Sequence, residues 1–195
     1  MKETILIFII LLIIYIFYYI NKMNYVSIES NSGTTYMVYN DELNKDKANL
    51  LSSIVINMCS LKNHLVKNKE SEDLIEYKDY INQLDENFNE YRTKIYETNP
   101  NSKLTSYSVN KGEELSICLK SKNTGKLHDI NLLMYVVIHE MAHFGCPEIG
   151  HGPLFQKIFK KFLEVAIKIN IYKLEDYSDK PVEYCGMILS SNIIE

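Results

Sequence analysis

The sequence predicts an α+β domain that follows one N-terminal transmembrane helix. Three features indicate this fold class: two pairs of short segments with alternating apolar residues, two long helical patterns, and an apolar helix that carries histidines. Of the 195 residues, those from 24 to 195 suffice for one domain with a sizeable core. We therefore expect the anchor at residues 1–23 and the domain at residues 24–195.

The N-terminal segment is strongly apolar. Residues 4–20 carry no charge and as a helix would extend about 25 Å, near the lower limit for crossing a bilayer. Tyr15, Tyr18 and Tyr19 lie toward its end, where an aromatic belt is expected. A cleaved signal peptide is the alternative, but it favours a shorter apolar centre and small residues at the cleavage site. The pattern favours a single-pass membrane protein, held in the lipid bilayer through residues 4–20, with its orientation open.

Two β-hairpins are predicted from alternating segments. Residues 25–30 and 34–39 flank a short polar turn, and residues 103–109 and 114–120 are joined by a turn that contains Gly112. The second hairpin precedes the histidine-bearing helix, so one of its strands could pair with an extended peptide; a plain structural hairpin is the alternative.

Two helices are expected between these hairpins. Residues 41–66 carry an apolar stripe, and residues 74–91 repeat apolar side chains at spacings of three and four. Packing of both helices in one core is favoured over a coiled coil. Pro100 ends the helical pattern.

The segment His139-Glu140-Met141-Ala142-His143 carries the chemistry of this chain. On an α-helix, residues four apart share a face, so His139 and His143 can direct their imidazoles at one point. Two neutral imidazoles supply half of a tetrahedral zinc shell, and Glu140 lies within reach of a metal-bound water. The pattern therefore predicts a catalytic metal site.

The surroundings of this segment favour a buried helix. Residues 132–138 form a continuous apolar run before it. Asp129 or Asn131 can cap the start of the helix, and Gly145 with Pro147 can end it. Buried histidines and a buried glutamate need polar partners, which a metal ion supplies.

A third ligand requires a chain reversal after the helix. The glycines and proline of residues 145–150 allow this turn, and His151 is the first strong ligand beyond it. Pro153 then suits the first turn of another helix. Glu148, in the turn, and Glu164, on the next helix, are the alternatives to His151 as third ligand.

The same residues carry a family resemblance. HExxH followed by His-Gly-Pro-x-Phe at residues 151–155 resembles the SprT-like and WLM groups of zincin peptidases, and the metzincin spacing does not match. With residues 105–113 and 181–187, the chain resembles the membrane-anchored WLM-type metallopeptidases of large double-stranded DNA viruses. The resemblance implies a zincin-like metallopeptidase fold in which His151 is the third zinc ligand.

Residues and resemblance together favour a membrane-anchored zinc-dependent peptidase that acts on protein or peptide substrates. His139, His143 and His151 would bind Zn²⁺, and Glu140 would take a proton from the zinc-activated water. Tyr184 could stabilise an oxyanion, with a buried core tyrosine as the alternative reading. The alternative function is an inactive, zinc-stabilised binding module that tethers a partner at a membrane, and such a module has no use for Glu140.

Charge and cysteine spacing add expectations about binding partners, the cellular compartment and the metal ligands. A net charge of −4 and a pI near 5.8 predict no nucleic-acid binding. The four cysteines show no CxxC spacing, so Cys59, Cys118 and Cys185 are interpreted as buried thiols and the domain is expected in a reducing compartment. Cys146 lies close enough to the histidines to be a rival metal ligand. The sequence leaves the oligomeric state open.

Overall fold

The computed structural model describes residues 2–191 and 193, with the side chains of the first helix described at residues 5–18. The helices are α1 (Lys2–Met23), α2 (Asn44–Asn68), the short 3₁₀ helix η1 (Ile75–Tyr77), α3 (Lys78–Asn87), α4 (Ile130–Gly145) and α5 (Pro153–Lys168). The strands are β1 (Tyr25–Glu29), β2 (Thr35–Tyr39), β3 (Lys94–Glu97), β4 (Tyr107–Val109), β5 (Glu114–Ile117), β6 (Val182–Tyr184) and β7 (Met187–Leu189).

A mixed sheet of order β1-β2-β3-β5-β4 organises the strands. The pairs β1/β2 and β4/β5 are antiparallel, which confirms both predicted hairpins. Strand β3, which the sequence did not predict, lies between the hairpins and pairs in parallel with β2 and β5. The strand therefore joins the two hairpins into one sheet and leaves β4 at its edge.

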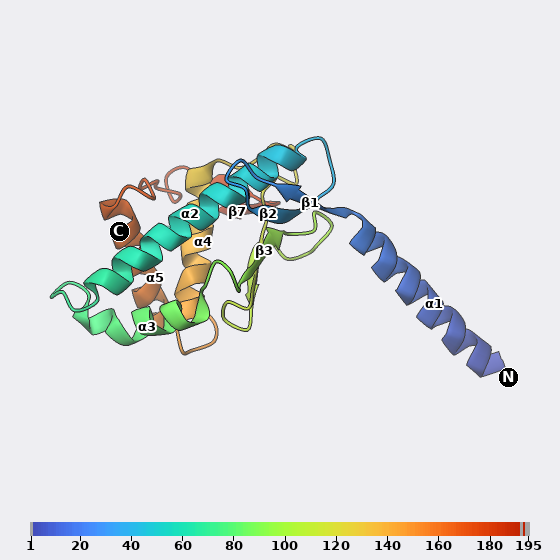
Figure 1. The fold of residues 1–195 in the computed structure, drawn as a ribbon, viewed down its shortest axis with the longest axis horizontal. Coiled ribbons are helices and arrows are strands. Elements are labelled where there is room, and N and C mark those ends of the chain that lie inside the picture. The colour runs from blue at the N-terminus through green and yellow to red at the C-terminus, as the bar shows by residue number, and fades with distance from the viewer. Residues whose placement is uncertain (1, 192, 194–195) are drawn as a thin grey trace.

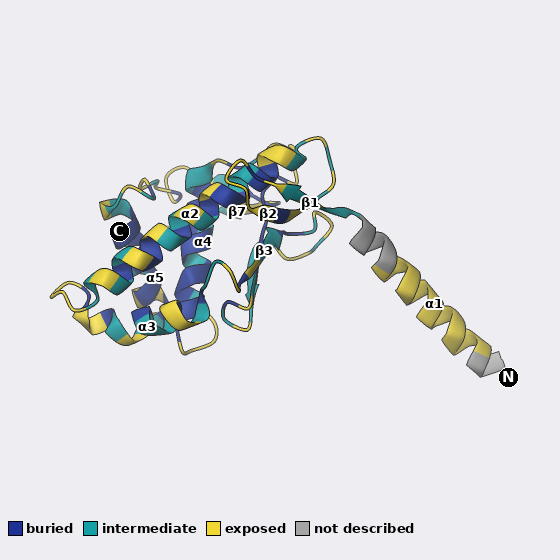
Figure 2. Ribbon diagram, viewed as in Figure 1, coloured by how far each residue is buried: buried dark blue, intermediate teal, exposed yellow. Residues whose placement is uncertain are grey.

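Helices α2 to α5 gather on one side of the molecule, and the five-stranded sheet lies between them and α1 (Figure 1). Helix α2 lies against β1, β2 and β3, while α4 contacts α2, α3 and α5. Side chains on the inner faces of these helices are buried (Figure 2). The mixed α+β fold is thus confirmed, with α4 at the centre of the helical layer.

The predicted helices form, with shifted ends. Helix α2 begins at Asn44, three residues later than predicted, and buries Ile54, Leu61 and Leu65 of the apolar stripe. The 74–91 pattern divides into η1 and α3, which ends at Asn87. Tyr91 lies beyond it and is 93% exposed, because the chain has already turned toward β3.

Helix α1 projects away from the rest of the chain, and the apolar side chains of residues 5–18 are exposed (Figures 1 and 2). Within the residues that the structure describes, no helix has both the length and the apolar character to span a membrane. This finding overturns the predicted single-pass anchor through residues 4–20 and the membrane localisation built on it.

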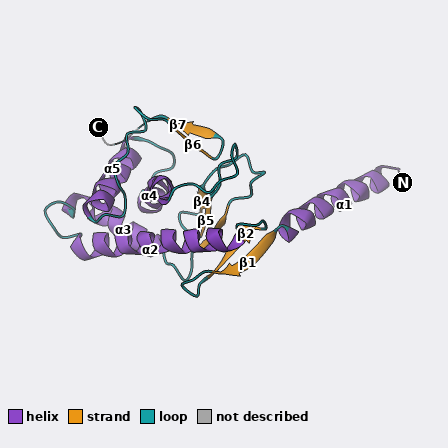
Figure 3. Ribbon diagram, turned by 90° about the horizontal axis from the view of Figure 1, so that it is seen from above, coloured by secondary structure: helices purple, strands orange, loops and turns teal. Residues whose placement is uncertain are grey.

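Strands β6 and β7 form a separate two-stranded sheet, which lies apart from β1 and β2 on the other side of the molecule (Figure 3). A disulfide between Cys118 and Cys185 connects this hairpin to the end of β5. The interpretation of these two residues as free thiols is therefore wrong, because the fold brings their Cα atoms to 6.4 Å, within the range of disulfides. The bond also contradicts the expected reducing compartment, where disulfides rarely persist.

Candidate metal centre

Helix α4 positions the first two histidines. Of the two predicted capping residues, Asp129 fills the role, since its side chain accepts a hydrogen bond from the backbone N–H of Asn131 at 2.8 Å. His139 and His143 lie on one face of the helix, with ring centroids 4.9 Å apart. Gly145 ends the helix where a Cβ atom would lie 2.8 Å from the backbone oxygen of Tyr80, so only glycine allows α4 to approach α3 this closely.

The chain then reverses to bring His151 back to α4. Gly150 takes a positive φ of 89° in this turn, and Pro153 occupies the first turn of α5, as predicted. Lys111, from the loop after β4, donates hydrogen bonds to the backbone oxygens of Cys146 (2.7 Å) and Pro147 (2.6 Å). The turn is thereby attached to the sheet.

The three histidines converge on one point. Nε2 of His151 lies 3.0 Å from Nε2 of His139 and 3.1 Å from Nε2 of His143. Nitrogens bound to one tetrahedral zinc ion at about 2.0–2.1 Å would lie roughly 3.3 Å apart, so the arrangement fits such an ion. Three imidazoles also leave one coordination position open, as catalytic zinc sites do.

The residues predicted as alternative third ligands lie outside the cluster of histidine nitrogens. Glu164 forms an ion pair with Lys161 at 2.9 Å on α5. Glu148 lines the same cavity as the histidines, but the set of ligand atoms within 4.8 Å of one another consists of His139, His143 and His151. Cys146 is a buried free thiol and is likewise outside this set.

The environment keeps the helical imidazoles neutral. Burial, together with the neighbouring histidines, lowers the pKa of His139 to about 3; burial, His151 and Lys111 lower the pKa of His143 to about 4. The ring of Phe155 stacks on His143 with centroids 4.2 Å apart and meets His139 edge-on at 4.8 Å. Neutral, immobilised imidazoles are suited to bind a metal ion.

Glu140 follows the first histidine and faces the edge strand. Its side chain is 6% exposed, and one carboxylate oxygen accepts a hydrogen bond of 2.8 Å from the Ser108 hydroxyl of β4. Burial raises the pKa of Glu140, and the Ser108 hydrogen bond partly offsets that rise. A carboxylate with a raised pKa is a stronger base than an exposed one.

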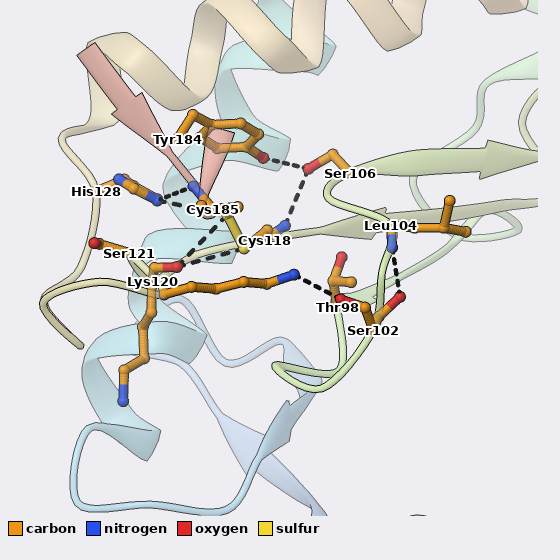
Figure 4. The surroundings of a disulfide bond; sticks show 12 residues. Thr98, Ser102, Leu104, Ser106, Cys118, Lys120, Ser121, His128, Tyr184 and Cys185 are labelled. Atoms are coloured by element: carbon orange, nitrogen blue, oxygen red, sulfur yellow. Dashed lines mark hydrogen bonds between the residues drawn. A yellow bond between two sulfur atoms is a disulfide. The ribbon is translucent and has the colours of Figure 1, made fainter. Parts of the chain in front are cut away.

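Tyr184 reaches the same region from β6. The residue is 1% exposed, and its hydroxyl is hydrogen bonded to Ser106 Oγ, which also accepts from the backbone N–H of Cys118 at 3.0 Å (Figure 4). Burial raises the pKa of Tyr184 well above its usual value, so the hydroxyl keeps its proton at neutral pH. Because Ser106 can donate its own proton to the phenol oxygen, the Tyr184 proton is available to another acceptor.

A cavity of about 590 Å³ joins these groups. Strand β4 forms one wall, α4 and the turn after it form the floor, and the β6–β7 hairpin supplies Tyr184, Met187 and Leu189. The structure thus brings together all five predicted site residues around one cavity.

Sequence analysis missed several contributors to this site. Ser108 lies in β4 and Ser106 directly precedes it, in the segment 105–113 that carries part of the resemblance. The sequence assigned neither residue a role, because the distance of β4 from α4 is set by the fold. Phe155 belongs to the His-Gly-Pro-x-Phe segment, but the sequence assigned it no role at the metal site, where its ring meets that of His151 edge-on.

Comparison with known proteins places the chain among viral proteins. No protein-family model matches it. An uncharacterised protein of Acanthamoeba polyphaga mimivirus is 39% identical over 161 residues, which is 83% of this chain and 80% of the relative. The chain belongs to the family of this mimivirus protein. The predicted relation to viral proteins is therefore confirmed.

Two shorter matches are also to viral proteins. An uncharacterised protein of invertebrate iridescent virus 6 is 39% identical over 69 residues, covering 34% of this chain and 38% of the relative. One of invertebrate iridescent virus 3 is 37% identical over 67 residues, covering 34% and 42%. These names assign no activity to the family.

Solved structures give a more distant likeness. A mutant of Wss1 from Saccharomyces cerevisiae aligns with a TM-score of 0.37 and 16% identity, covering 53% of this chain and 87% of Wss1. A second Wss1 structure gives a TM-score of 0.36 and 17% identity, covering 52% and 83%.

Proposed function

We propose that this protein is a zinc-dependent peptidase that hydrolyses peptide bonds in extended protein segments. The observation that carries the proposal is the convergence of three imidazoles, in which Nε2 of His139 and of His143 lie within 3.1 Å of His151 Nε2, beside the buried carboxylate of Glu140. A purely structural zinc site is closed by four protein ligands and has no need of a buried base. Three ligands, a base and an adjoining cavity are the parts of a hydrolytic site.

His139, His143 and His151 would hold the ion. When bound there, zinc would act as a Lewis acid at its open position and lower the pKa of a water toward about 7. Glu140 would accept a proton from this water and deliver it to the nitrogen of the departing amine. Ser108 would orient the Glu140 carboxylate through their hydrogen bond.

Strand β4 is the proposed substrate platform. It pairs with β5 on one side and lies at the edge of the sheet, where its other side borders the cavity. An extended peptide can add to such an edge through backbone hydrogen bonds, with little demand on its sequence. Unfolded segments are therefore the expected substrates.

Tyr184 would stabilise the negative charge that develops on the carbonyl oxygen. We expect Tyr184→Phe to reduce kcat by about tenfold or more, the scale for loss of one oxyanion donor, while KM and zinc content stay the same. Tyr172→Phe is the matched control, because Tyr172 is also buried, at 2% exposure, but does not line the cavity. An unchanged kcat for Tyr184→Phe would restrict Tyr184 to a packing role.

Metal removal tests the function directly. Full-length protein is incubated with unfolded protein substrates, and cleavage products are identified by mass spectrometry. We expect cleavage that stops after chelation and returns when zinc is added in stoichiometric amounts. Protein that binds about one zinc per chain yet cleaves nothing across a broad substrate set would favour a binding module instead.

A further inference from the structure

The Cys118–Cys185 disulfide lies directly behind one wall of the proposed active site. Cys118 follows the last residue of β5, and Cys185 stands in the turn between β6 and β7, 67 residues later in the sequence (Figure 4). Both residues are buried. The bond thus connects the main sheet to the hairpin that carries Tyr184.

Apart from the disulfide, the hairpin is joined to the rest of the domain by packing and by hydrogen bonds that involve side chains. Its strands pair only with each other among the described strands, so no backbone ladder joins them to the main sheet. Besides the disulfide, His128 Nε2 accepts a hydrogen bond from the Cys185 backbone N–H at 3.3 Å, and the Tyr184 hydroxyl bonds to Ser106. Glu183 also interacts with Ser121.

The conformation of Cys185 indicates that this position serves the cross-link. Cys185 and Gly186 form a two-residue turn with φ of 53° and 87°. Asparagine, aspartate or glycine is the usual first residue of such a turn, because other side chains are disfavoured at positive φ. A cysteine there places its sulfur toward Cys118 and directs the preceding side chain, Tyr184, at Ser106.

We propose that the Cys118–Cys185 disulfide is a redox latch that holds the β6–β7 hairpin and Tyr184 in the catalytic position. The inference rests on the proposed peptidase function and adds its regulation. When the bond breaks, two thiols cannot remain at covalent distance, so the Cys185 sulfur must move away from that of Cys118, and the turn that it held is released. Tyr184 is the direct neighbour of Cys185 and would move with it, which takes the phenol proton away from the reacting carbonyl.

The chemistry of the latch is thiol–disulfide exchange with a dithiol. One thiolate of the dithiol attacks a protein sulfur and forms a mixed disulfide, and the second thiolate then displaces that protein sulfur. The dithiol leaves as its own disulfide, and Cys118 and Cys185 together gain two electrons and two protons. The oxidised dithiol reverses the reaction and closes the latch.

The test compares oxidised and reduced full-length protein that is loaded with zinc. A phosphine replaces the dithiol as reductant, because dithiols chelate zinc; with one water, the phosphine becomes its oxide and leaves two thiols. Peptide mapping without reductant first establishes the Cys118–Cys185 link. We expect reduction to lower kcat by about tenfold, with KM within about twofold and zinc content unchanged.

Three variants separate the latch from other effects of the reductant. Cys118→Ala/Cys185→Ala should show the low kcat without reductant and should not respond to it. Cys59→Ser, which changes a cysteine outside the disulfide, should respond as the parent does. In Tyr184→Phe, reduction should change kcat less than about twofold, because the group that the latch positions is already absent.

Hydrogen exchange provides a readout that does not depend on activity. Reduction should accelerate amide exchange at residues 182–189 and leave residues 139–143 unchanged. If oxidised protein cleaves nothing, the proposed function fails, whereas accelerated exchange would still support the latch. If the oxidised protein is active and reduction changes neither kcat nor exchange, the latch is refuted.

A second metal ion would also overturn the proposal. Ligand atoms of Cys118, His128 and Cys185 lie within 4.8 Å of one another, a set of soft ligands that suits zinc once the thiols are free. Reduced protein that takes up a second zinc equivalent and retains full kcat would show that these residues form a metal clamp instead of a latch.

Discussion

Replacing Glu140 by glutamine is expected to reduce peptidase activity by about a hundredfold or more, the usual contribution of a positioned base. Glutamine has nearly the same shape and can still accept the Ser108 hydrogen bond, but it cannot take a proton from water. Zinc content should stay at about one ion per chain, because the three imidazoles are unchanged. The measurements are kcat/KM on an unfolded substrate and metal analysis of the same sample.

The folded state should tolerate this change. Burial disfavours the charged form of Glu140, so a neutral amide removes a desolvation cost and the melting temperature should be equal or slightly higher. Glu148→Gln is the control, because it removes a carboxylate from the same cavity without touching the proposed base. Full activity in Glu140→Gln would eliminate Glu140 as the base and, with it, the proposed mechanism.

Loss of His151 is expected to abolish both zinc binding and activity. His139 and His143 alone provide two ligands, and His→Ala removes the nitrogen that lies within 3.1 Å of both. His151 is exposed, so the metal-free variant should melt at the same temperature as metal-free parent protein. Only the stabilisation that added zinc gives the parent should be missing.

The rival ligands define the controls for this experiment. Glu148→Gln and Glu164→Gln should each retain about one zinc per chain and most of the activity. Glu164 is already engaged with Lys161, and Glu148 lies outside the cluster of ligand atoms. Full zinc content in His151→Ala, combined with loss of zinc in either glutamine variant, would transfer the third position to that glutamate.

The histidines and hairpins that the sequence predicted depend on residues that are close together in the chain. His139 and His143 are four residues apart on a helix with a strong apolar pattern, so their common face follows from helix geometry alone. His151 required only a short reversal marked by glycine and proline. The two hairpins were equally predictable, because each depends on neighbouring alternating segments.

The features that were missed depend on contacts between distant segments. Strand β3 consists of Lys94–Glu97, and its parallel partners come from two different hairpins, so nothing within the segment identifies it as central. The pairing of Cys118 with Cys185 spans 67 residues and cannot be deduced from spacing. At the N-terminus, in contrast, the sequence predicted a feature that the structure does not support. The apolar composition suggested a membrane span, which the described helix does not bear out.

Lys111 connects the edge strand to the turn that leads to His151, since its ammonium group donates hydrogen bonds to two backbone oxygens just beyond α4. The distance from β4 to the three imidazoles is then fixed by the protein and does not adapt to the bound chain. A peptide paired with β4 can slip by two residues and keep its side chains on the same face, whereas a slip of one residue turns every side chain over. Cleavage positions would therefore be set by backbone register, in steps of two residues, more than by the identity of any one side chain.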